Sequence, residues 1–266
     1  MLEFGKALDI GKTRLGKKNQ DNLKIIRRWS KRPLLVIADG MGGYEGGAEA
    51  SRLVIKTFQR TYKVRVGDSN ITQDLLKAIS VAHNRIIQRS KSSENLSKMG
   101  STVVAVAVDK KKNLLHIANV GDSRAYLITR EAIRQISYDH SEVAELLRNG
   151  MITPEEAQNY KRKNVLTMSL SGSRPEGSLT PFLQTESFPK DCVILLCSDG
   201  LWGPVEESLI HLIALEYAPQ AAAERLVKMA NMNGGPDNIS VLIARRKSEW
   251  KEYKKKYSRD LEDTNG

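Results

Sequence analysis

The sequence is poor in cysteine, because its 266 residues include only Cys192 and Cys197. These two residues lie five positions apart in a short apolar segment. An odd offset along a strand places side chains on opposite faces of a sheet, so we do not expect them to form a disulfide. Two unbridged thiols of this kind are typical of small core residues in a reducing compartment.

Histidine and the common nucleophile motifs are also scarce. The histidines are His83, His116, His140 and His211, and none of them has the spacing of metal ligands. A zinc site built from Cys and His is therefore excluded. The sequence also lacks a Gly-x-Ser-x-Gly elbow, a complete Gly-x4-Gly-Lys-Ser/Thr loop and a Cys-x5-Arg loop. These absences argue against serine hydrolases, P-loop nucleotidases and cysteine phosphatases.

Long apolar runs and targeting signals are missing as well. No apolar run approaches the roughly 20 residues that a transmembrane helix needs, and the segment from Met1 to Gly5 has no basic region followed by an apolar stretch. We therefore expect a cytoplasmic protein without a transmembrane segment. The net charge of +11 favours contact with nucleic acid, anionic membranes or acidic proteins, without selecting among them.

The most informative segment runs from Leu34 to Gly43. Its apolar part, Leu34–Ala38, has no alternating polar residue and predicts a strand that is buried on both faces. Asp39 follows directly, and three of the next four residues are glycines. This arrangement would place a carboxylate beside a backbone that can approach a ligand closely. An ordinary Asp-Gly turn is the alternative interpretation.

Three further aspartates occur in the same context as Asp39. Each lies where a core strand meets a loop: Asp122, Asp199 and Asp237. Four such residues suggest a carboxylate cluster at one end of a sheet. Clustered carboxylates stay ionised together only when cations neutralise them, and ligation by oxygen alone selects Mg²⁺ or Mn²⁺. The reaction most natural to such a site is hydrolysis of a phosphate ester.

The rest of the pattern predicts a mixture of strands and helices in one domain, residues 1–246. Residues 1–22 are polar and glycine-rich, which predicts mostly loop. Residues 23–28 should form a hairpin with the strand at Leu34. Helices are expected at 45–55, 71–89, 142–148, 153–156 and after Pro204. Three short runs (101–108, 114–120 and 124–128) predict an antiparallel meander, and further core strands are expected at 193–197 and 239–244.

Residues 247–266 form a basic tail with a helical stripe of Trp250, Tyr253, Tyr257 and Leu261. One interpretation is a terminal helix that docks on its own domain, or a solvated tail. The other is a basic amphipathic contact for an acidic partner or an anionic surface.

Seven short motifs occur in an order that resembles the metal-dependent type 2C protein serine/threonine phosphatases (the PPM family), especially the bacterial members. The motifs are Asn19-Gln20-Asp21, Asp39-Gly40-Met41-Gly42-Gly43, Gly100-Ser101-Thr102, Gly121-Asp122-Ser123-Arg124, Asp139-His140-Ser141, Ser198-Asp199-Gly200-Leu201 and Gly234-Gly235-Pro236-Asp237-Asn238. The resemblance covers roughly residues 5–246. It implies an α+β fold, a four-layer α-β-β-α sandwich with a central pair of antiparallel β-sheets.

The resemblance also implies roles for individual residues. Asp39 matches the acid that bridges two metal ions, and Gly40 matches the residue that binds metal through its carbonyl. Asp199 and Asp237 match further ligands, and Asp122 matches the ligand of a third, looser ion. Asp21 matches the acid that orients metal-bound water, and residues 142–165 match the flap beside the active site. The implied cofactors are two Mg²⁺ or Mn²⁺ ions with a possible third. The implied reaction is direct attack of a metal-bridging hydroxide on phosphorus.

The residue that grips the substrate phosphate is open. Family members carry an arginine shortly before the Asn-Glu/Gln-Asp motif, and the spacing here fits poorly. Arg14 is the first candidate and Lys17 the second, while Lys18 is also near; a lysine lacks the bidentate fork of arginine. A second departure is Met168, where many relatives have arginine. An alternative for Asp122 and Arg124 is a surface ion pair in a hairpin.

The implied partners are phosphoserine and phosphothreonine proteins of a kinase pathway, and we expect a monomer. Two other functions compete. A catalytically inactive relative would bind phosphoproteins as a module, which the intact Asp39, Asp199 and Asp237 argue against. A metal-dependent nuclease would suit the positive charge, but the domain has no basic stripe interleaved with aromatic residues. We therefore expect no specific binding of nucleic acid.

Overall fold

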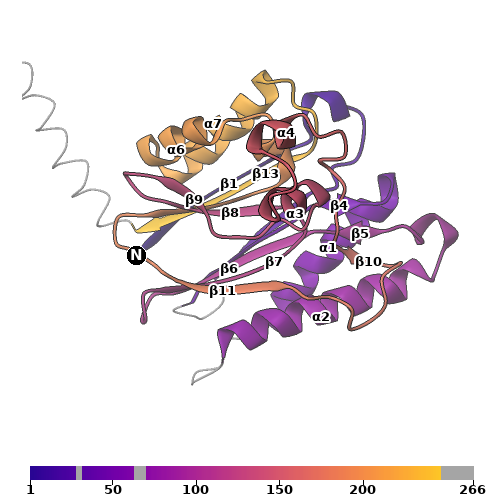
Figure 1. Cartoon of the computed structure of the whole chain (residues 1–266). Coiled ribbons are helices and arrows are strands. Elements are labelled where there is room, and N and C mark those ends of the chain that lie inside the picture. Colours follow the sequence, from indigo (N-terminus) through magenta and orange to yellow (C-terminus); the bar gives the residue numbers. More distant parts are fainter. Residues whose placement is uncertain (28–31, 63–69, 247–266) are drawn as a thin grey trace, which may run out of the picture.

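The computed structural model describes residues 1–27, 32–62 and 70–246. Two five-stranded antiparallel sheets lie face to face, with helices on both outer sides (Figure 1). The expected α+β four-layer sandwich is confirmed by this arrangement. The tail predicted at residues 247–266 lies outside the described residues, as does residue 28 of the predicted hairpin. Within the described ranges, no helix combines the length and apolar content that a bilayer span requires.

The first sheet has the order β11-β7-β6-β3-β2, and the second has the order β1-β13-β12-β8-β9. A small third sheet, β10-β5-β4, lies at one end of the first. The strands of the first sheet are β2 (Asn22–Ile26), β3 (Leu34–Ala38), β6 (Val103–Asp109), β7 (Leu114–Val120) and β11 (Phe182–Ser187). Those of the second are β1 (Leu2–Asp9), β8 (Arg124–Ile128), β9 (Ile133–Gln135), β12 (Val193–Cys197) and β13 (Ile239–Arg246). The short strands are β4 (Gly40–Met41), β5 (Gly100–Ser101) and β10 (Leu170–Ser171).

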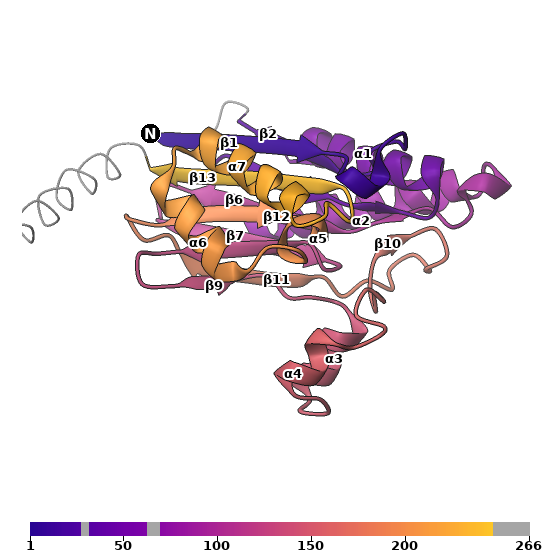
Figure 2. The ribbon, with the colours of Figure 1, turned by 90° about the horizontal axis from the view of Figure 1, so that it is seen from above.

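Helices cover each outer face. Two helices pack against the first sheet, α1 (Tyr44–Thr61) and α2 (Ile71–Ser90). Two others pack against the second sheet, α6 (Glu207–Glu216) and α7 (Pro219–Met232). Shorter helices lie near the ends of strands: α3 (Glu142–Arg148), α4 (Pro154–Gln158), α5 (Asp199–Trp202), and the 3₁₀ turns η1 (Lys12–Arg14) and η2 (Glu94–Leu96). Figure 2 shows α3 and α4 projecting away from the sandwich, so the segment predicted as a flap stands apart from the body.

The central strands are buried on both faces, as their unbroken apolar sequences predict. In β3, Leu34 and Val36 face α1 and α2, whereas Leu35 and Ile37 face the other sheet. The same alternation separates the cysteines: Cys192 packs between the sheets and Cys197 packs against the outer helices. Neither cysteine forms a disulfide, as the sequence predicts. Three apolar layers therefore hold the four structural layers together.

Two sequence predictions about strands are wrong. The loop prediction for the N-terminal residues holds for 10–21, apart from η1, but it misses β1, which pairs with β13 along its whole length, from Leu2 with Arg246 to Asp9 with Ile239. Gly5 makes this possible, since a Cβ there would lie 1.9 Å from the carbonyl oxygen of Pro219 in α7. The hairpin of β2 and β3 is confirmed.

Of the three strands in the predicted meander, only β6 and β7 pair with each other. Its third member, β8, pairs with β12 and β9 in the opposite sheet. The reason is the turn at Gly121, whose φ of 102° is accessible to glycine and carries the chain out of the first sheet. This turn contains Asp122, so the change of sheet also places one of the candidate acids.

Candidate active site

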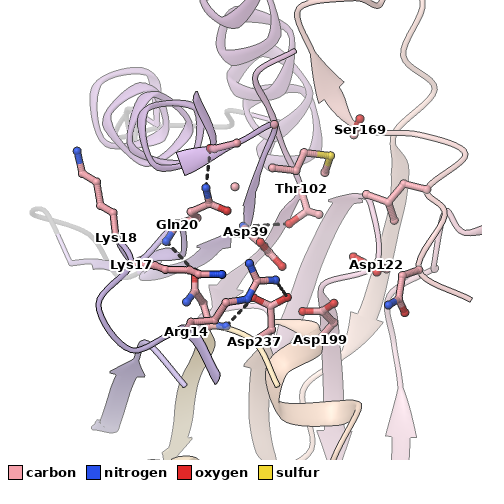
Figure 3. A pocket seen from close by; sticks show the side chains of 17 residues that line it. Arg14, Lys17, Lys18, Gln20, Asp39, Thr102, Asp122, Ser169, Asp199 and Asp237 are labelled. Atoms are coloured by element: carbon pink, nitrogen blue, oxygen red, sulfur yellow. Dashed lines mark hydrogen bonds and ion pairs between the residues drawn. The ribbon is translucent and has the colours of Figure 1, made fainter. Parts of the chain in front are cut away.

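Both sheets end at the same pocket, which has a volume of about 580 Å³ (Figure 3). Asp39 follows β3 and Asp122 follows β7, so the first sheet supplies these two acids. Asp199 follows β12 and Asp237 precedes β13 in the second sheet. All four aspartates line the pocket. The sequence prediction of a carboxylate cluster at the ends of core strands thus agrees with their position.

The main chain around Asp39 is fixed by close packing. The Asp39 N–H donates to the hydroxyl of Thr102 at 3.1 Å. Gly40 pairs with Ser101, and a Cβ on Gly40 would lie 2.0 Å from the carbonyl oxygen of Gly47 in α1. Glycine is therefore required here because the first turn of α1 approaches the strand end closely. Gly40 also lines the pocket, so the pocket wall at this point includes main chain.

Asp21 lies behind the pocket rather than in its lining. Its side chain is buried, and its Oδ2 accepts hydrogen bonds from the hydroxyls of Ser198 and Ser240, both at 2.7 Å. Neither serine was assigned a role from the sequence. Ser240 does carry a signal, because it is the one polar residue in the apolar run Ile239–Ala244. Ser198 precedes Asp199 and Ser240 lies in β13, so the two hydroxyls connect Asp21 to the second sheet.

The acids raise one another's pKa values. Removal from water raises the pKa of Asp39 well above its usual value of 3.8, and the charges of neighbouring aspartates add to the effect. Those neighbours are Asp21, Asp199, Asp122 and Asp237. The pKa of Asp199 is also well above its usual value, for the same two reasons in the same order. Burial raises the pKa of Asp21 to about 6, and burial followed by the charge of Asp139 raises that of Asp122 to about 6.

These acids fit a divalent cation. Asp199 Oδ1 and Asp21 Oδ1 are buried and have no hydrogen-bond partner among the described residues. Such orphaned carboxylate oxygens are unfavourable unless a cation compensates them. No three His, Cys, Asp or Glu side chains of the described ranges form a complete ligand cluster as they stand. Main-chain oxygen or water would therefore complete an all-oxygen shell around a cation at these acids.

The three basic candidates all line the pocket, but their surroundings differ. Arg14, at the end of η1, forms an ion pair with Asp237 at 2.7 Å between NH2 and Oδ2. Lys18 points away from the carboxylates in Figure 3. Arg14 therefore contacts the acid cluster directly. Arg124 forms ion pairs with Asp139 at 2.8 Å and with Glu207 at 3.6 Å, rather than the ion pair with Asp122 of the hairpin alternative.

The flap contributes to the opposite rim. Asn164 of the flap lines the pocket, as do Leu166 and Ser169 in the segment that follows it, and the sequence predicts no role for any of the three. The sequence gives no role to Asn238 beyond its place in a motif. In the structure its side chain accepts a hydrogen bond from the Gln20 N–H and donates one to the Ile10 carbonyl, both at 2.8 Å. It ties the N-terminal loop to β13. Contacts between such distant positions leave no periodic signal in a sequence.

The profile of the family described as "Protein phosphatase 2C" matches residues 11–237, which contain every one of these acids. The chain belongs to the protein phosphatase 2C family. The resemblance inferred from the seven motifs is thereby confirmed. As a member, the chain is a phosphoprotein phosphatase with Mg²⁺ or Mn²⁺ as cofactor, in agreement with the acids described above.

Bacterial relatives support the same assignment. The serine/threonine phosphatase stp of Listeria innocua is 34% identical over 232 residues, which are 86% of this chain and 90% of that protein. The structure of Stp1 from Staphylococcus aureus has a TM-score of 0.84 at 30% identity and covers 93% of this chain and 96% of that one. The catalytic domain of PstP, described as a complex with two manganese ions, has a TM-score of 0.79 at 31% identity, covering 92% and 97%.

The raised pKa values predict how pH affects the metal-free protein. A carboxyl group with a folded-state pKa above its usual 3.8 binds protons more tightly in the folded state. Its contribution to stability is therefore fully present below pH 3.8 and is lost as the pH rises through about 6 and beyond. We expect the melting temperature in EDTA to rise when the pH falls from about 8 to about 5, and the stabilisation by Mn²⁺ to shrink over the same range.

Circular dichroism of unfolding at several pH values, with EDTA or Mn²⁺, measures both effects. Asp39→Asn removes one charge of the cluster and is the matched control. Its metal-free melting temperature should exceed that of the wild type at pH 8 and depend less on pH. An identical pH dependence in the two proteins would contradict the assignment of the effect to the cluster.

Proposed function

We propose that this phosphatase hydrolyses phosphoserine and phosphothreonine in proteins by direct in-line attack of a water-derived hydroxide on phosphorus. The observation that carries the proposal is the convergence of four aspartates from both sheets in one pocket. At such a site, Mg²⁺ or Mn²⁺ supplies an acidified water and neutralises charge on the phosphoryl group. Asp39, Asp199 and Asp237, with the carbonyl of Gly40, would hold two ions, and Asp122 would hold a third.

The chain's own residues support attack by water without a covalent intermediate. No cysteine or histidine is among the described residues that line the pocket. Both cysteines are buried elsewhere, and burial raises the pKa of Cys197, so that thiol stays protonated. We propose that Asp21 orients a water, because its carboxylate lies near Asp39 and its Oδ1 is buried without a hydrogen-bond partner among the described residues.

Arg14 is the residue that we propose for binding the substrate phosphate. Its guanidinium already meets Asp237 at the edge of the acid cluster, so it lies beside the place where phosphate must sit. A guanidinium can offer two parallel N–H donors to phosphate oxygens, whereas an ammonium acts as a point charge. The ion pair with Asp237 restrains the orientation of that side chain.

A first experiment tests the reaction itself. With Mn²⁺, the chain should hydrolyse p-nitrophenyl phosphate and a phosphothreonine peptide, and EDTA should abolish both activities. Asp199→Ala should lower the rate by at least about a hundredfold, since a ligand to the cation is lost. Asp191→Ala, an exposed aspartate at the far end of β12, is the matched control and should keep the wild-type rate.

Two outcomes of this experiment would favour other functions. Phosphopeptide binding without turnover, despite bound Mn²⁺, would indicate an inactive binding module. Cleavage of nucleic acid that Asp199→Ala abolishes would indicate a nuclease. A chain ending at Arg246, the last residue of β13, tests the proposed domain of residues 1–246, and unchanged peptide hydrolysis and melting temperature are expected for it.

A second experiment compares Arg14→Ala with Lys17→Ala. Loss of charged hydrogen bonds to phosphate should lower kcat/KM of Arg14→Ala for the phosphopeptide by about tenfold or more, mainly through KM. The inhibition constant of inorganic phosphate should rise in parallel. Lys17→Ala should change both by less. A larger effect of Lys17→Ala would assign the phosphate contact to the lysine instead.

We also propose that the chain opposes a serine/threonine protein kinase. A protein kinase produces phosphoserine and phosphothreonine, the substrates that this site would consume. Cells that lack the protein should therefore accumulate phosphothreonine and phosphoserine on a limited set of proteins, which phosphoproteomics can measure. Restoring wild-type protein should reverse the accumulation, and restoring Asp199→Ala should not. An unchanged phosphoproteome would contradict the proposal.

A further inference from the structure

The turn that carries Asp122 is held from the side of the second sheet by Trp202. This residue ends α5, three positions after Asp199, and its indole N–H donates to the carbonyl oxygen of Asp122 at 3.1 Å. This hydrogen bond joins the main chain of Asp122 to α5, the short helix that begins with Asp199. A shift of the indole would therefore move the Asp122 turn relative to Asp199.

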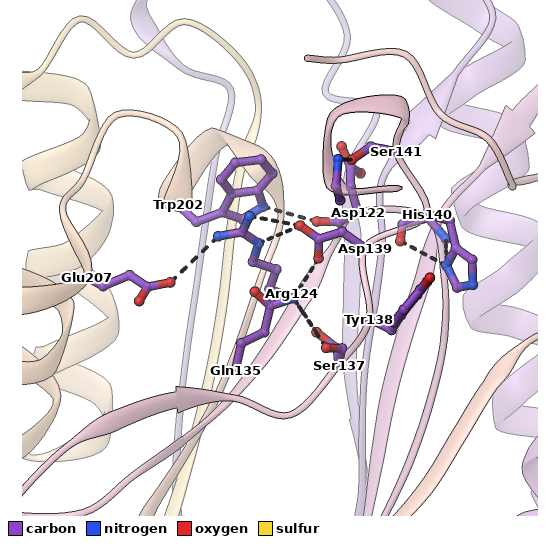
Figure 4. Close-up of polar contacts among 12 residues, drawn as sticks. Asp122, Arg124, Gln135, Ser137, Tyr138, Asp139, His140, Ser141, Trp202 and Glu207 are labelled. Atoms are coloured by element: carbon purple, nitrogen blue, oxygen red, sulfur yellow. Dashed lines mark hydrogen bonds and ion pairs between the residues drawn. The ribbon is translucent and has the colours of Figure 1, made fainter. Parts of the chain in front are cut away.

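Arg124 fixes the indole in turn (Figure 4). Its guanidinium carbon lies 3.7 Å from the centroid of the Trp202 ring, a cation–π contact within the protein. The same guanidinium contacts Asp139 Oδ2 through Nε at 2.9 Å and through NH2 at 2.8 Å, and NH1 donates to the Tyr126 hydroxyl at 3.1 Å. With this many restraints, the arginine is a rigid support for the indole.

A second support acts on Gly121, the residue before Asp122. The Gly121 main-chain N–H donates to the ring Nδ1 of His140 at 3.2 Å, and the main-chain N–H of His140 donates to the Gly121 carbonyl at 3.0 Å. Burial lowers the pKa of His140, which favours the neutral ring that can accept at Nδ1. The turn is thus held on one side by Trp202 and on the other by the chain that leads into the flap.

The flap is attached to the same group of residues through Arg148, in the last turn of α3. Both terminal nitrogens of Arg148 donate to the carbonyl oxygen of Asp139 at 3.3 Å, and its guanidinium carbon lies 3.6 Å from the centroid of the Tyr138 ring. Asp139 therefore binds Arg124 with its side chain and Arg148 with its main chain. At the base of the flap, Ser141 and Leu166 form a single bridge between the two chain segments.

We propose that Trp202 and Arg124 are positioning residues for Asp122, and that Arg148 couples the flap to them through Asp139. The affinity of Asp122 for a cation then depends on the position of the flap relative to Asp139, and a bound cation in turn restrains the flap. The inference rests on the proposed role of Asp122 as a ligand of the third ion. It adds a physical link between that ion and the segment that forms the rim of the substrate pocket.

The test uses the full chain and Mn²⁺ titrations by calorimetry. Asp122→Asn identifies the binding event that belongs to Asp122, because that event should disappear while the tighter events remain. Trp202→Phe keeps a ring for Arg124 but removes the N–H donor, and Arg148→Gln removes the cation that contacts Tyr138. Each should weaken the Asp122 event by roughly two- to tenfold, the effect of one lost hydrogen bond, and leave the tighter events unchanged.

Arg162→Gln is the matched control for Arg148→Gln. Arg162 is an exposed flap arginine that pairs with Glu142 at 2.8 Å within the flap, so its loss should not alter the Asp122 event. Hydrogen exchange of residues 142–165 provides a second measurement. Mn²⁺ should slow it in the wild type and in Arg162→Gln, and slow it less in Arg148→Gln and Asp122→Asn.

The outcomes separate the inference from the proposal on which it rests. Wild-type Mn²⁺ affinity in both Trp202→Phe and Arg148→Gln, with the event lost in Asp122→Asn, would overturn the positioning role alone. Retention of every binding event in Asp122→Asn would overturn the ligand assignment, and the inference with it. Lower melting temperatures without a change in affinity would also overturn the inference, because they would indicate only a structural role.

Discussion

Repulsion among the enclosed carboxylates is the constraint on which this structure depends. Asp39 lies near four other aspartates, and its pKa is raised both by its removal from water and by their charges. Such a group would separate if the chain allowed it. It stays together because the acids follow or precede strands that are fully buried, such as β3 and β12. The free energy of packing the sandwich therefore holds charges in place for a cation to neutralise.

The division of the acids between two sheets makes the site sensitive to the packing of one sheet against the other. Asp39 and Asp122 belong to the first sheet, and Asp199 and Asp237 to the second. The layer between the sheets, which includes Ile37 and Leu196, determines how far apart the two pairs lie. Asp21 adds a direct tie, because a residue of the first sheet's loop accepts hydrogen bonds from Ser198 and Ser240 of the second. Substitutions in that apolar layer should thus affect cation binding as well as stability.

The parts of the site that the sequence predicts are those with local signals. Asp39 directly follows an unbroken apolar strand, and Asp199 follows another with one serine between. The sequence alone therefore predicts that both lie at a strand end. The supports of the site have no such signal. Trp202 reaches Asp122 across 80 positions of sequence, and Asn238 holds Gln20 across 218. The strand β1 was missed because its polar and glycine residues lie at a sheet edge, where pairing with β13 decides its conformation.

The pairing of β1 with β13 also has a consequence for biosynthesis. The first strand of the chain has the last described strand as its only neighbour in the sheet, and β13 is also the partner of β12. Before β13 has been translated, β1 lacks the strand with which it pairs in the native sheet, and Asp237 has not yet joined the other acids. The second sheet therefore closes only after the segment to Arg246 has been translated. Until then a nascent chain holds an incomplete cluster, so we expect hydrolysis only after Asp237 and β13 have been made.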